Sequence, residues 1–201
     1  MKQETKELFL GEDNIYGGFY ELVFQVCPND NNDPIKLYTE YIWNLNCVFG
    51  PLNLDFTKIP INNQHDTDDT IIINNGILIL NNYEIPFKTI NVCENIGYNW
   101  FDISINTPII NKVFGKEYII EDSVNPKIPN ELKVFFKKIA KELYKIYPFQ
   151  LGMSGYEVSG INSIENILKN EIDNNKYISY YIGNNYYNKL SLNTKKYVIL
   201  I

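Results

Sequence analysis

The chain has 201 residues, the usual length of one domain, and 45% of them are hydrophobic. All 18 basic residues are lysines, so the protein lacks the guanidinium groups that best hold phosphate and carboxylate. The net charge of −6 disfavours DNA and anionic membranes as partners. We therefore expect one globular domain over residues 1–201 that binds neither nucleic acid nor membrane.

The charge is distributed unevenly along the chain. Residues 1–126 carry 7 Lys and 18 Asp or Glu, a net charge of −11, whereas residues 127–201 carry 11 Lys and 6 Asp or Glu, a net charge of +5. An acidic majority of this kind favours a basic protein partner. The alternative is a charged surface that only keeps the protein in solution.

The cysteines indicate a reducing compartment. Cys27, Cys47 and Cys93 are odd in number and widely spaced, and the chain has no C-x-x-C pair of the kind that binds zinc or exchanges thiols. Residues 1–14 are too polar for a signal peptide, and no apolar run has the length of a membrane span. The sequence predicts a cytoplasmic protein with three free, mostly buried thiols and no cofactor or metal.

The first predicted strand covers residues 17–27, where apolar and polar side chains alternate as in a half-buried strand. A helix follows, with Asp33 as its cap and Pro34 at its first position. Its apolar residues recur at steps of three and four, which predicts an amphipathic helix as far as Asn46.

The middle of the chain predicts a meander of antiparallel strands at residues 70–74, 76–80 and 83–95. Asn74-Asn75-Gly76 and Asn81-Asn82 separate these strands, and asparagine tolerates the left-handed backbone that tight turns require. Three more elements are expected: a strand at 99–106, a short helix at 107–114 and a short strand at 116–122.

The longest predicted helix covers residues 128–148, with an apolar stripe on one side and lysines on the other. A glycine-containing strand follows, then a modest helix at 162–172 and strands in a tail that contains an Asn-Asn turn. The fold class is therefore α+β, with a largely antiparallel sheet, one long amphipathic helix and two or three shorter ones. Residues 17–160 are expected to form the core of the domain, and residues 161–201 to add a helix and C-terminal strands.

The stretch Gly152-Met153-Ser154-Gly155-Tyr156 is similar to a nucleophile elbow, in which a catalytic serine follows the pattern G-x-S-x-G. Tyr156 replaces the final glycine, and the residues that follow favour a strand rather than a helix. His65 is the chain's one histidine, and a serine triad would require it beside Ser154. We therefore interpret the stretch as a strand whose glycines permit close packing.

The loop 65–69 groups His65 with three aspartates, an arrangement that can hold calcium. The central glycine and the final glutamate of an EF-hand loop are absent, so a solvated loop is the preferred interpretation.

Three carboxylates lie in predicted strands between apolar neighbours: Glu21, Asp102 and Glu157. Two carboxyl groups about 5–9 Å apart could perform acid–base hydrolysis of the glycosidase type. The alternative is that each carboxylate points to solvent from the outer face of the sheet. Glu157 has the most room, because glycines lie on both sides of it.

Aromatic residues form the candidate binding surface. The tail carries Tyr180, Tyr181, Tyr186 and Tyr187, and tyrosine is enriched at interfaces. The alternative is that these side chains pack beneath a helix. A further hypothesis is a small-ligand pocket lined by Trp100 and Tyr156.

Several segments resemble a family of uncharacterised bacterial proteins. They are the Tyr20-Glu21-Leu22 strand, the strand that contains Trp100, and the stretch from Gly155 to Gly160. The resemblance covers residues 17–160 and implies a bacterial origin and a single globular fold, without an activity. Ser154 stands where the family has an aliphatic residue, which further disfavours a catalytic serine.

The leading hypothesis is a non-enzymatic cytoplasmic protein that binds a protein partner, of the immunity or regulatory type, because no complete catalytic set is present. The alternative is a carboxylate-dependent hydrolase that uses Glu157 and Asp102, with Glu21 as a further candidate.

Overall fold

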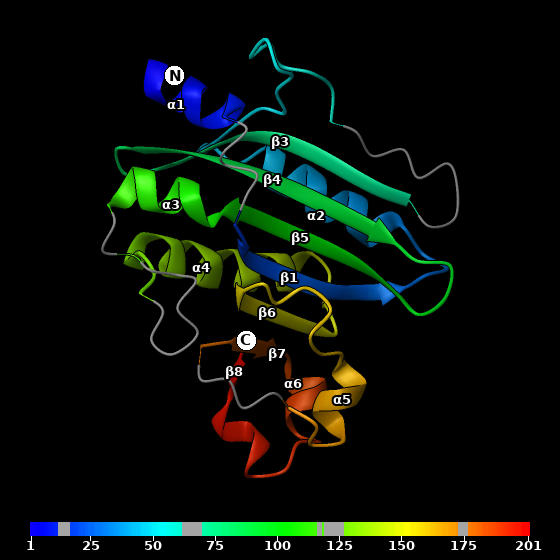
Figure 1. Ribbon diagram of the computed structural model, residues 1–201. Coiled ribbons are helices and arrows are strands. Elements are labelled where there is room, and N and C mark those ends of the chain that lie inside the picture. Colours follow the sequence, from blue (N-terminus) through cyan, green and yellow to red (C-terminus); the bar gives the residue numbers. More distant parts are fainter. Residues whose placement is uncertain (12–16, 62–69, 116–117, 119–126, 173–176) are drawn as a thin grey trace.

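The computed structural model describes residues 1–11, 17–61, 70–115, 118, 127–172 and 177–201. One eight-stranded sheet, in the order β2-β3-β4-β5-β1-β6-β7-β8, organises the molecule (Figure 1). Its strands are β1 (Phe19–Pro28), β2 (Val48–Phe49), β3 (Thr70–Leu80), β4 (Tyr83–Cys93), β5 (Tyr98–Asn106), β6 (Leu151–Tyr156), β7 (Ser179–Ile182) and β8 (Val198–Leu200).

Helices lie on both faces of this sheet. They are α1 (Gln3–Leu10), α2 (Asp33–Trp43), α3 (Thr107–Phe114), α4 (Asn130–Ile146), α5 (Ile164–Leu168) and α6 (Asn184–Tyr187), with a 3₁₀ turn at Thr194–Lys196. All strand pairs are antiparallel except β7 with β8. The predicted α+β class, the largely antiparallel sheet and the single long helix are therefore confirmed.

Strand β1 lies in the middle of the sheet, between β5 and β6. Both of its faces are covered, so Tyr20, Leu22 and Phe24 are buried on one side, and Glu21 and Gln25 are buried on the other. The prediction of a half-buried strand is wrong for this reason. A glutamate and a glutamine in a fully buried strand require hydrogen-bond partners inside the protein.

The main core lies between the sheet and the helices α2 and α4. The apolar stripe of α4 is buried there, as its periodicity predicts, and its lysines point away. The members of the stripe are Leu132, Phe135, Phe136, Ile139, Ala140 and Leu143. Ile35, Tyr38, Ile42 and Trp43 of α2 pack beside them on the same face of the sheet.

A smaller core lies on the opposite face, over β1, β6 and β7. Val23 and Met153 contribute to it from the sheet, and Ile164 and Ile167 from α5. At the other end of this face, Thr5 of α1 donates a hydrogen bond to Glu84 of β4 at 2.7 Å. The stretch of β3, β4 and β5 between α1 and α5 has no helix over it among the described residues (Figure 1).

Two predicted turns have different outcomes. The turn at Asn81-Asn82 is confirmed, because it joins β3 to β4 and Asn81 has a left-handed φ of 52°. The turn at Asn74-Asn75-Gly76 is wrong, because β3 runs without a break from Thr70 to Leu80. Gly76 has another reason to be glycine: the indole ring of Trp43 lies against it.

The tail also differs from the prediction. The asparagines at 184 and 185 begin the helix α6 instead of a turn between strands. The helix predicted at 162–172 is only five residues long, with Ser163 as its cap in a capping box with Asn166. The strand predicted at 116–122 and the loop 65–69 lie outside the described residues.

The predicted free thiols are confirmed. Cys27 and Cys93 are buried and Cys47 is half-buried, and none forms a disulfide. Burial raises the pKa of Cys27 to about 12 and that of Cys93 to about 11, so both stay protonated at neutral pH. In the part of the chain that the structure describes, no helix combines the length and the apolar character needed to cross a lipid bilayer.

Candidate functional site

The surface of β3, β4 and β5 opposite α2 and α4, over which the described residues place no helix between α1 and α5, carries a continuous group of apolar side chains. We call it the open face and define it by Ile71, Ile73, Ile90, Val92 and Trp100. Cross-strand pairing places Ile71 beside Val92 and Val92 beside Trp100, while Ile73 lies beside Ile90. Ile71 is 65% exposed and Ile73 is 50% exposed. Apolar groups exposed together in this way mark interaction sites in soluble proteins.

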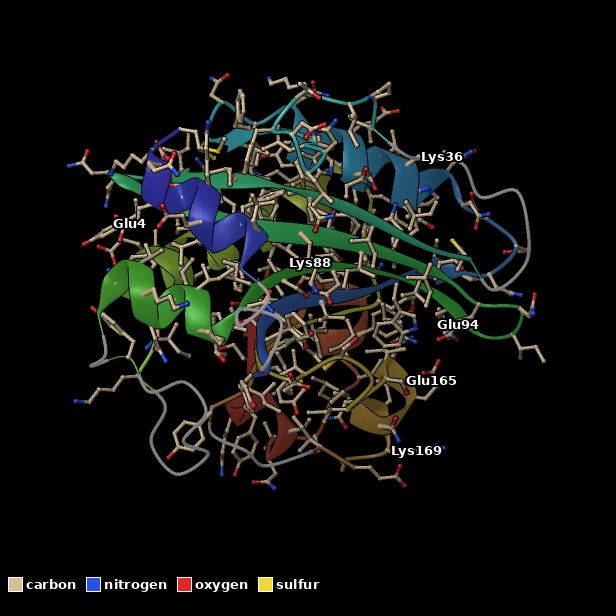
Figure 2. All side chains as sticks on the ribbon, turned by 45° about the horizontal axis from the view of Figure 1, so that its top comes forward. Glu4, Lys36, Lys88, Glu94, Glu165 and Lys169 are labelled. Atoms are coloured by element: carbon tan, nitrogen blue, oxygen red, sulfur yellow. The ribbon has the colours of Figure 1, made fainter. Side chains whose placement is uncertain are left out.

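A pocket of about 380 Å³ adjoins the open face next to Trp100. Its lining residues are Gln25, Val92, Glu94, Gly97, Tyr98, Trp100, Ser159, Gly160, Ser163 and Glu165. We call it the Trp100 pocket. Figure 2 shows Glu94 at the turn between β4 and β5 and Glu165 on α5, at the same end of the sheet. The pocket therefore combines an indole ring with two carboxylates from different elements.

The charge of Glu165 is stabilised by its neighbours. Partial burial favours the neutral acid, but hydrogen bonds from the backbone of Glu165 and from Ser163, Tyr98 and Gln25 outweigh it. Together they lower the pKa of Glu165 below its ordinary value, so this carboxyl is ionised at neutral pH. The Trp100 pocket thus holds a fixed negative charge.

A cluster of polar side chains lies on the same face, closer to its centre, where Figure 2 labels Lys88. Asp102 of β5 accepts a hydrogen bond from Ser104 Oγ at 2.9 Å, and Glu21 of β1 lies on the neighbouring strand. Glu21 and Asp102 are each only 5% exposed. We call Glu21, Lys88, Asp102 and Ser104 the carboxylate cluster.

Glu21 is anchored by the chain that follows β6. Its Oε2 accepts hydrogen bonds from the backbone N–H groups of Val158 at 2.9 Å and Ser159 at 3.0 Å. These two donors explain how a glutamate is tolerated in the central strand, since each bond satisfies a buried polar group. Glu21 therefore holds the segment after β6 against the sheet.

The pKa of Asp102 is raised by its surroundings. Burial raises its pKa well above the ordinary value, and the neighbouring Glu21 carboxylate raises it further. The opposing effects of Ser104 and Lys88 are smaller, and burial lowers the pKa of Lys88. Asp102 Oδ1 has no hydrogen-bond partner among the described residues. The cluster therefore favours the neutral form of Asp102 beside Glu21.

We expect the raised pKa of Asp102 to make stability depend on pH. Between the ordinary pKa of 3.8 and the raised pKa of the folded state, the native protein binds the Asp102 proton more tightly than the unfolded chain. The free energy of unfolding should therefore fall as the pH rises through this window. The original protein should lose free energy of unfolding between pH 5 and pH 8, as measured by urea unfolding. Asp102→Asn should reduce this loss by at least about 1 kcal/mol, since one pKa unit corresponds to about 1.4 kcal/mol.

The matched control for this prediction is Asp55→Asn, which changes an exposed aspartate. This variant should lose as much stability between pH 5 and pH 8 as the original protein. Equal losses in Asp102→Asn and in the original protein would contradict a raised pKa of Asp102.

Glu157 is exposed, and although it is not one of the buried members of the carboxylate cluster, it is close enough to Glu21 to help raise the pKa of that carboxyl. Its Oε1 accepts a hydrogen bond from Phe19 N at 2.8 Å, and its own N–H donates to Phe19 O at 2.9 Å. Glu157 also has a left-handed φ of 50°, which a residue other than glycine rarely adopts. These contacts give it the role of ending the pairing of β1 with β6. The structure places Asp102 beside Glu21 rather than beside Glu157.

The tail tyrosines do not form a common surface. Tyr180 is 1% exposed and Tyr181 is 3% exposed, because β7 is covered on both faces. Tyr180 Oη accepts a hydrogen bond from Asn162 at 2.8 Å inside the smaller core. Tyr186 and Tyr187 are half-buried on α6, where they pack against that core. The hypothesis of a tyrosine binding surface in the tail is therefore contradicted by the burial of Tyr180 and Tyr181.

The structure also separates Trp100 from Tyr156. Trp100 pairs with Gln25 of β1 and Tyr156 pairs with Tyr20. Positions 20 and 25 of a strand point to opposite faces, so Tyr156 lies on the side of the main core. A single pocket between the two aromatic residues is not formed, whereas Trp100 does line a pocket with Glu94 and Glu165.

Ser154 is not in a nucleophile elbow. Strand β6 continues through it, and its side chain is 4% exposed on the side of the main core. Its hydroxyl is hydrogen-bonded to Tyr181 Oη at 3.2 Å. The interpretation of this stretch as a packed strand agrees with these positions.

Sequence reasoning missed Lys88, Glu94 and Glu165. Lys88 could have been found from the alternation in β4, because Lys88, Ile90 and Val92 share one face of the strand. The run Ile71-Ile72-Ile73 was a signal for the open face. It places apolar side chains on both faces of the strand, so each face is either covered by the core or exposed as an apolar surface. No sequence signal brings Glu94 and Glu165 together.

Comparisons of this chain with protein-family models, with curated proteins and with solved structures found no match. The resemblance to a family of uncharacterised bacterial proteins therefore stays a prediction. What the protein does has to be inferred from the chemistry of the open face and the pockets.

Proposed function

We propose that the protein is a non-enzymatic, cytoplasmic binding protein that acts through contact with a basic protein partner, as immunity or regulatory proteins do. The observation that carries this proposal is the exposure of Ile71 and Ile73 on a sheet face that ends at an acidic pocket. Exposed isoleucines in an apolar row lose contact with water when a partner covers them, and this favours association.

The residues that line the Trp100 pocket favour a partner with a basic side chain at its surface. A lysine or arginine side chain of the partner would enter it with its charge over the indole ring, where a cation–π contact contributes about 0.5–2 kcal/mol. Glu94 and the ionised Glu165 lie at the pocket wall and complement that charge. Apolar side chains around this cation would cover Ile71 and Ile73. The arrangement joins a charged anchor to an apolar contact area, as protein interfaces commonly do.

A carboxylate-dependent hydrolase is the second candidate. It is favoured by one observation, the buried Asp102 with a raised pKa beside Glu21, which is the arrangement of a general acid next to a second carboxyl. Substrate would have to reach these groups, and both are only 5% exposed. We therefore rank the binding protein first, and Glu21 takes the place of Glu157 in the alternative.

Site-specific crosslinking in the native cell tests the binding proposal. A photoreactive amino acid at Ile73 should give one protein adduct, whereas the same amino acid at Val134, which is 59% exposed on α4, should not. Glu94→Gln with Glu165→Gln should reduce the Ile73 adduct several-fold by removing the complementary charge. Glu40→Gln with Glu131→Gln makes the same change of charge on α2 and α4 and should leave the adduct unchanged.

Equal adducts at Ile73 and Val134, or an adduct at Ile73 that both double variants reduce equally, would contradict the proposal. Loss of folding does not explain a negative result here. Ile73 is half exposed, so its replacement should change the free energy of unfolding by no more than about 0.5 kcal/mol.

A further inference from the structure

A second pocket lies on the opposite face of the sheet, between α4 and the strands β1, β6, β7 and β8. It has a volume of about 250 Å³. Its lining residues are Tyr20, Ile128, Lys133, Lys137, Ser154, Tyr177, Ser179, Tyr181 and Ile199. We call it the hydroxyl pocket, because five of these nine side chains end in a hydroxyl group. It is separate from the open face and is not used in the function proposed above.

The floor of the pocket is a group of neighbouring hydroxyl groups. Ser154 is hydrogen-bonded to Tyr181 at 3.2 Å, and the hydroxyls of Tyr20 and Ser179 belong to the same lining. The Ser154–Tyr181 pair uses one of its two hydroxyl hydrogens in this bond, which leaves the other for a further acceptor. Tyr20 and Tyr181 are each 3% exposed and Ser154 is 4% exposed. The buried floor therefore has a hydroxyl donor available for a ligand that occupies the pocket.

The tyrosine hydroxyls remain donors at physiological pH. Burial raises the pKa of Tyr20 and of Tyr181 above the ordinary value of 10.0. Neither hydroxyl becomes an anion that would repel a negatively charged ligand. The floor thus stays neutral while presenting polar hydrogens.

Two lysines form the rim of the pocket. Lys133 and Lys137 are four residues apart on α4, so their side chains extend from the same side of the helix, and both are exposed. Like charges at this spacing repel each other and destabilise a helix by a few tenths of a kcal/mol. An anion bound between the two ammonium groups would remove this repulsion and gain charge-assisted hydrogen bonds.

We propose that the hydroxyl pocket is a binding site for a small phosphorylated molecule. The phosphate group lies between Lys133 and Lys137 and accepts a hydrogen bond from the hydroxyl floor, while Ile128 and Ile199 contact the organic part. Lysine binds phosphate as a point charge, which suits a chain whose 18 basic residues are all lysines. The volume of about 250 Å³ accepts a phosphate with a short organic group.

Titration calorimetry with inorganic phosphate and with glycerol 3-phosphate tests this site in the full chain. Both should bind at one site, and the phosphate ester should bind more tightly because it also fills the apolar part of the pocket. Lys133→Gln with Lys137→Gln should weaken binding about tenfold or more, which corresponds to about 1.4 kcal/mol. Tyr181→Phe removes one floor hydroxyl without changing the volume of the ring and should weaken binding several-fold.

The control variant carries Lys138→Gln and Lys141→Gln, which make the same change of charge on α4 at residues that do not line the pocket. It should bind both probes as the original protein does. Equal weakening in the two lysine variants, or full binding by Tyr181→Phe, would overturn the assignment, because the anion would then respond only to the total charge of the helix. Absence of saturable binding by either probe to the original protein would also overturn it.

Discussion

Glu21→Ala is expected to lower the free energy of unfolding by about 2–5 kcal/mol, because it removes the acceptor of two backbone N–H groups, one of them buried, and a carboxylate beside Lys88. The backbone N–H groups of Val158 and Ser159 both donate to Glu21 Oε2 and would lose their acceptor. Lys88, whose charge is opposed by burial, would lose one of its two neighbouring carboxyls. Urea unfolding followed by circular dichroism at neutral pH measures the change.

Glu21→Gln serves as the matched variant, because its amide oxygen still accepts from Val158 and Ser159. It should keep more than half of the stability that Glu21→Ala loses. Glu157→Ala provides the contrast on the exposed side, where loss of one hydrogen bond to Phe19 should cost less than about 1 kcal/mol. An unfolding midpoint of Glu21→Ala equal to that of the original protein would show that these contacts do not stabilise the fold.

Gly76→Ala should have the second large effect, a loss of about 2–3 kcal/mol. A Cβ atom at this position would lie 2.5 Å from Cζ3 of Trp43 and 2.7 Å from the carbonyl oxygen of Phe49. The indole cannot move away easily, since Trp43 is 5% exposed and its Nε1 donates to Thr89 Oγ1 at 3.1 Å. Insertion of a methyl group into a packed core typically costs about 1–3 kcal/mol. Thermal unfolding followed by tryptophan fluorescence checks this result.

A double-mutant cycle with Trp43→Leu identifies the cause of this loss. Removal of the indole opens the space beside Gly76, so Gly76→Ala should cost clearly less in the Trp43→Leu background. Asn75→Ala, at the preceding position of β3, which is exposed, should change the free energy of unfolding by less than about 0.5 kcal/mol. The packing explanation would be wrong if Gly76→Ala cost the same with and without Trp43.

The example of Gly76 shows where sequence reasoning succeeds and where it stops. Local patterns correctly predicted the long helix and the turn at Asn81-Asn82, because both depend on residues close together in the chain. Asn74-Asn75-Gly76 has the same turn chemistry, yet it lies inside a strand. Glycine is required at position 76 because the ring of Trp43, more than thirty positions earlier in the chain, packs against it. A local sequence pattern cannot indicate such a contact.

The same distinction applies to the candidate site. Glu21 and Asp102 could be selected as carboxylates within apolar strands, but their pairing depends on β1 being inserted between β5 and β6. That strand order also decides which face Trp100 and Tyr156 occupy. Glu165 was missed because it reaches the Trp100 pocket only after α5 folds over the end of β1. Non-local pairing, rather than residue type, created the site.

The lysines of α4 and the carboxylates Glu94 and Glu165 of the Trp100 pocket lie on opposite sides of the sheet, which separates these charges of opposite sign. In the field of the proposed basic partner, this separation of charge would turn the open face toward that partner before the two surfaces touch. Fewer encounters would then occur in unproductive orientations, and association would be faster. Added salt screens this effect beyond about 8–10 Å and slows the approach while leaving the final contacts in place.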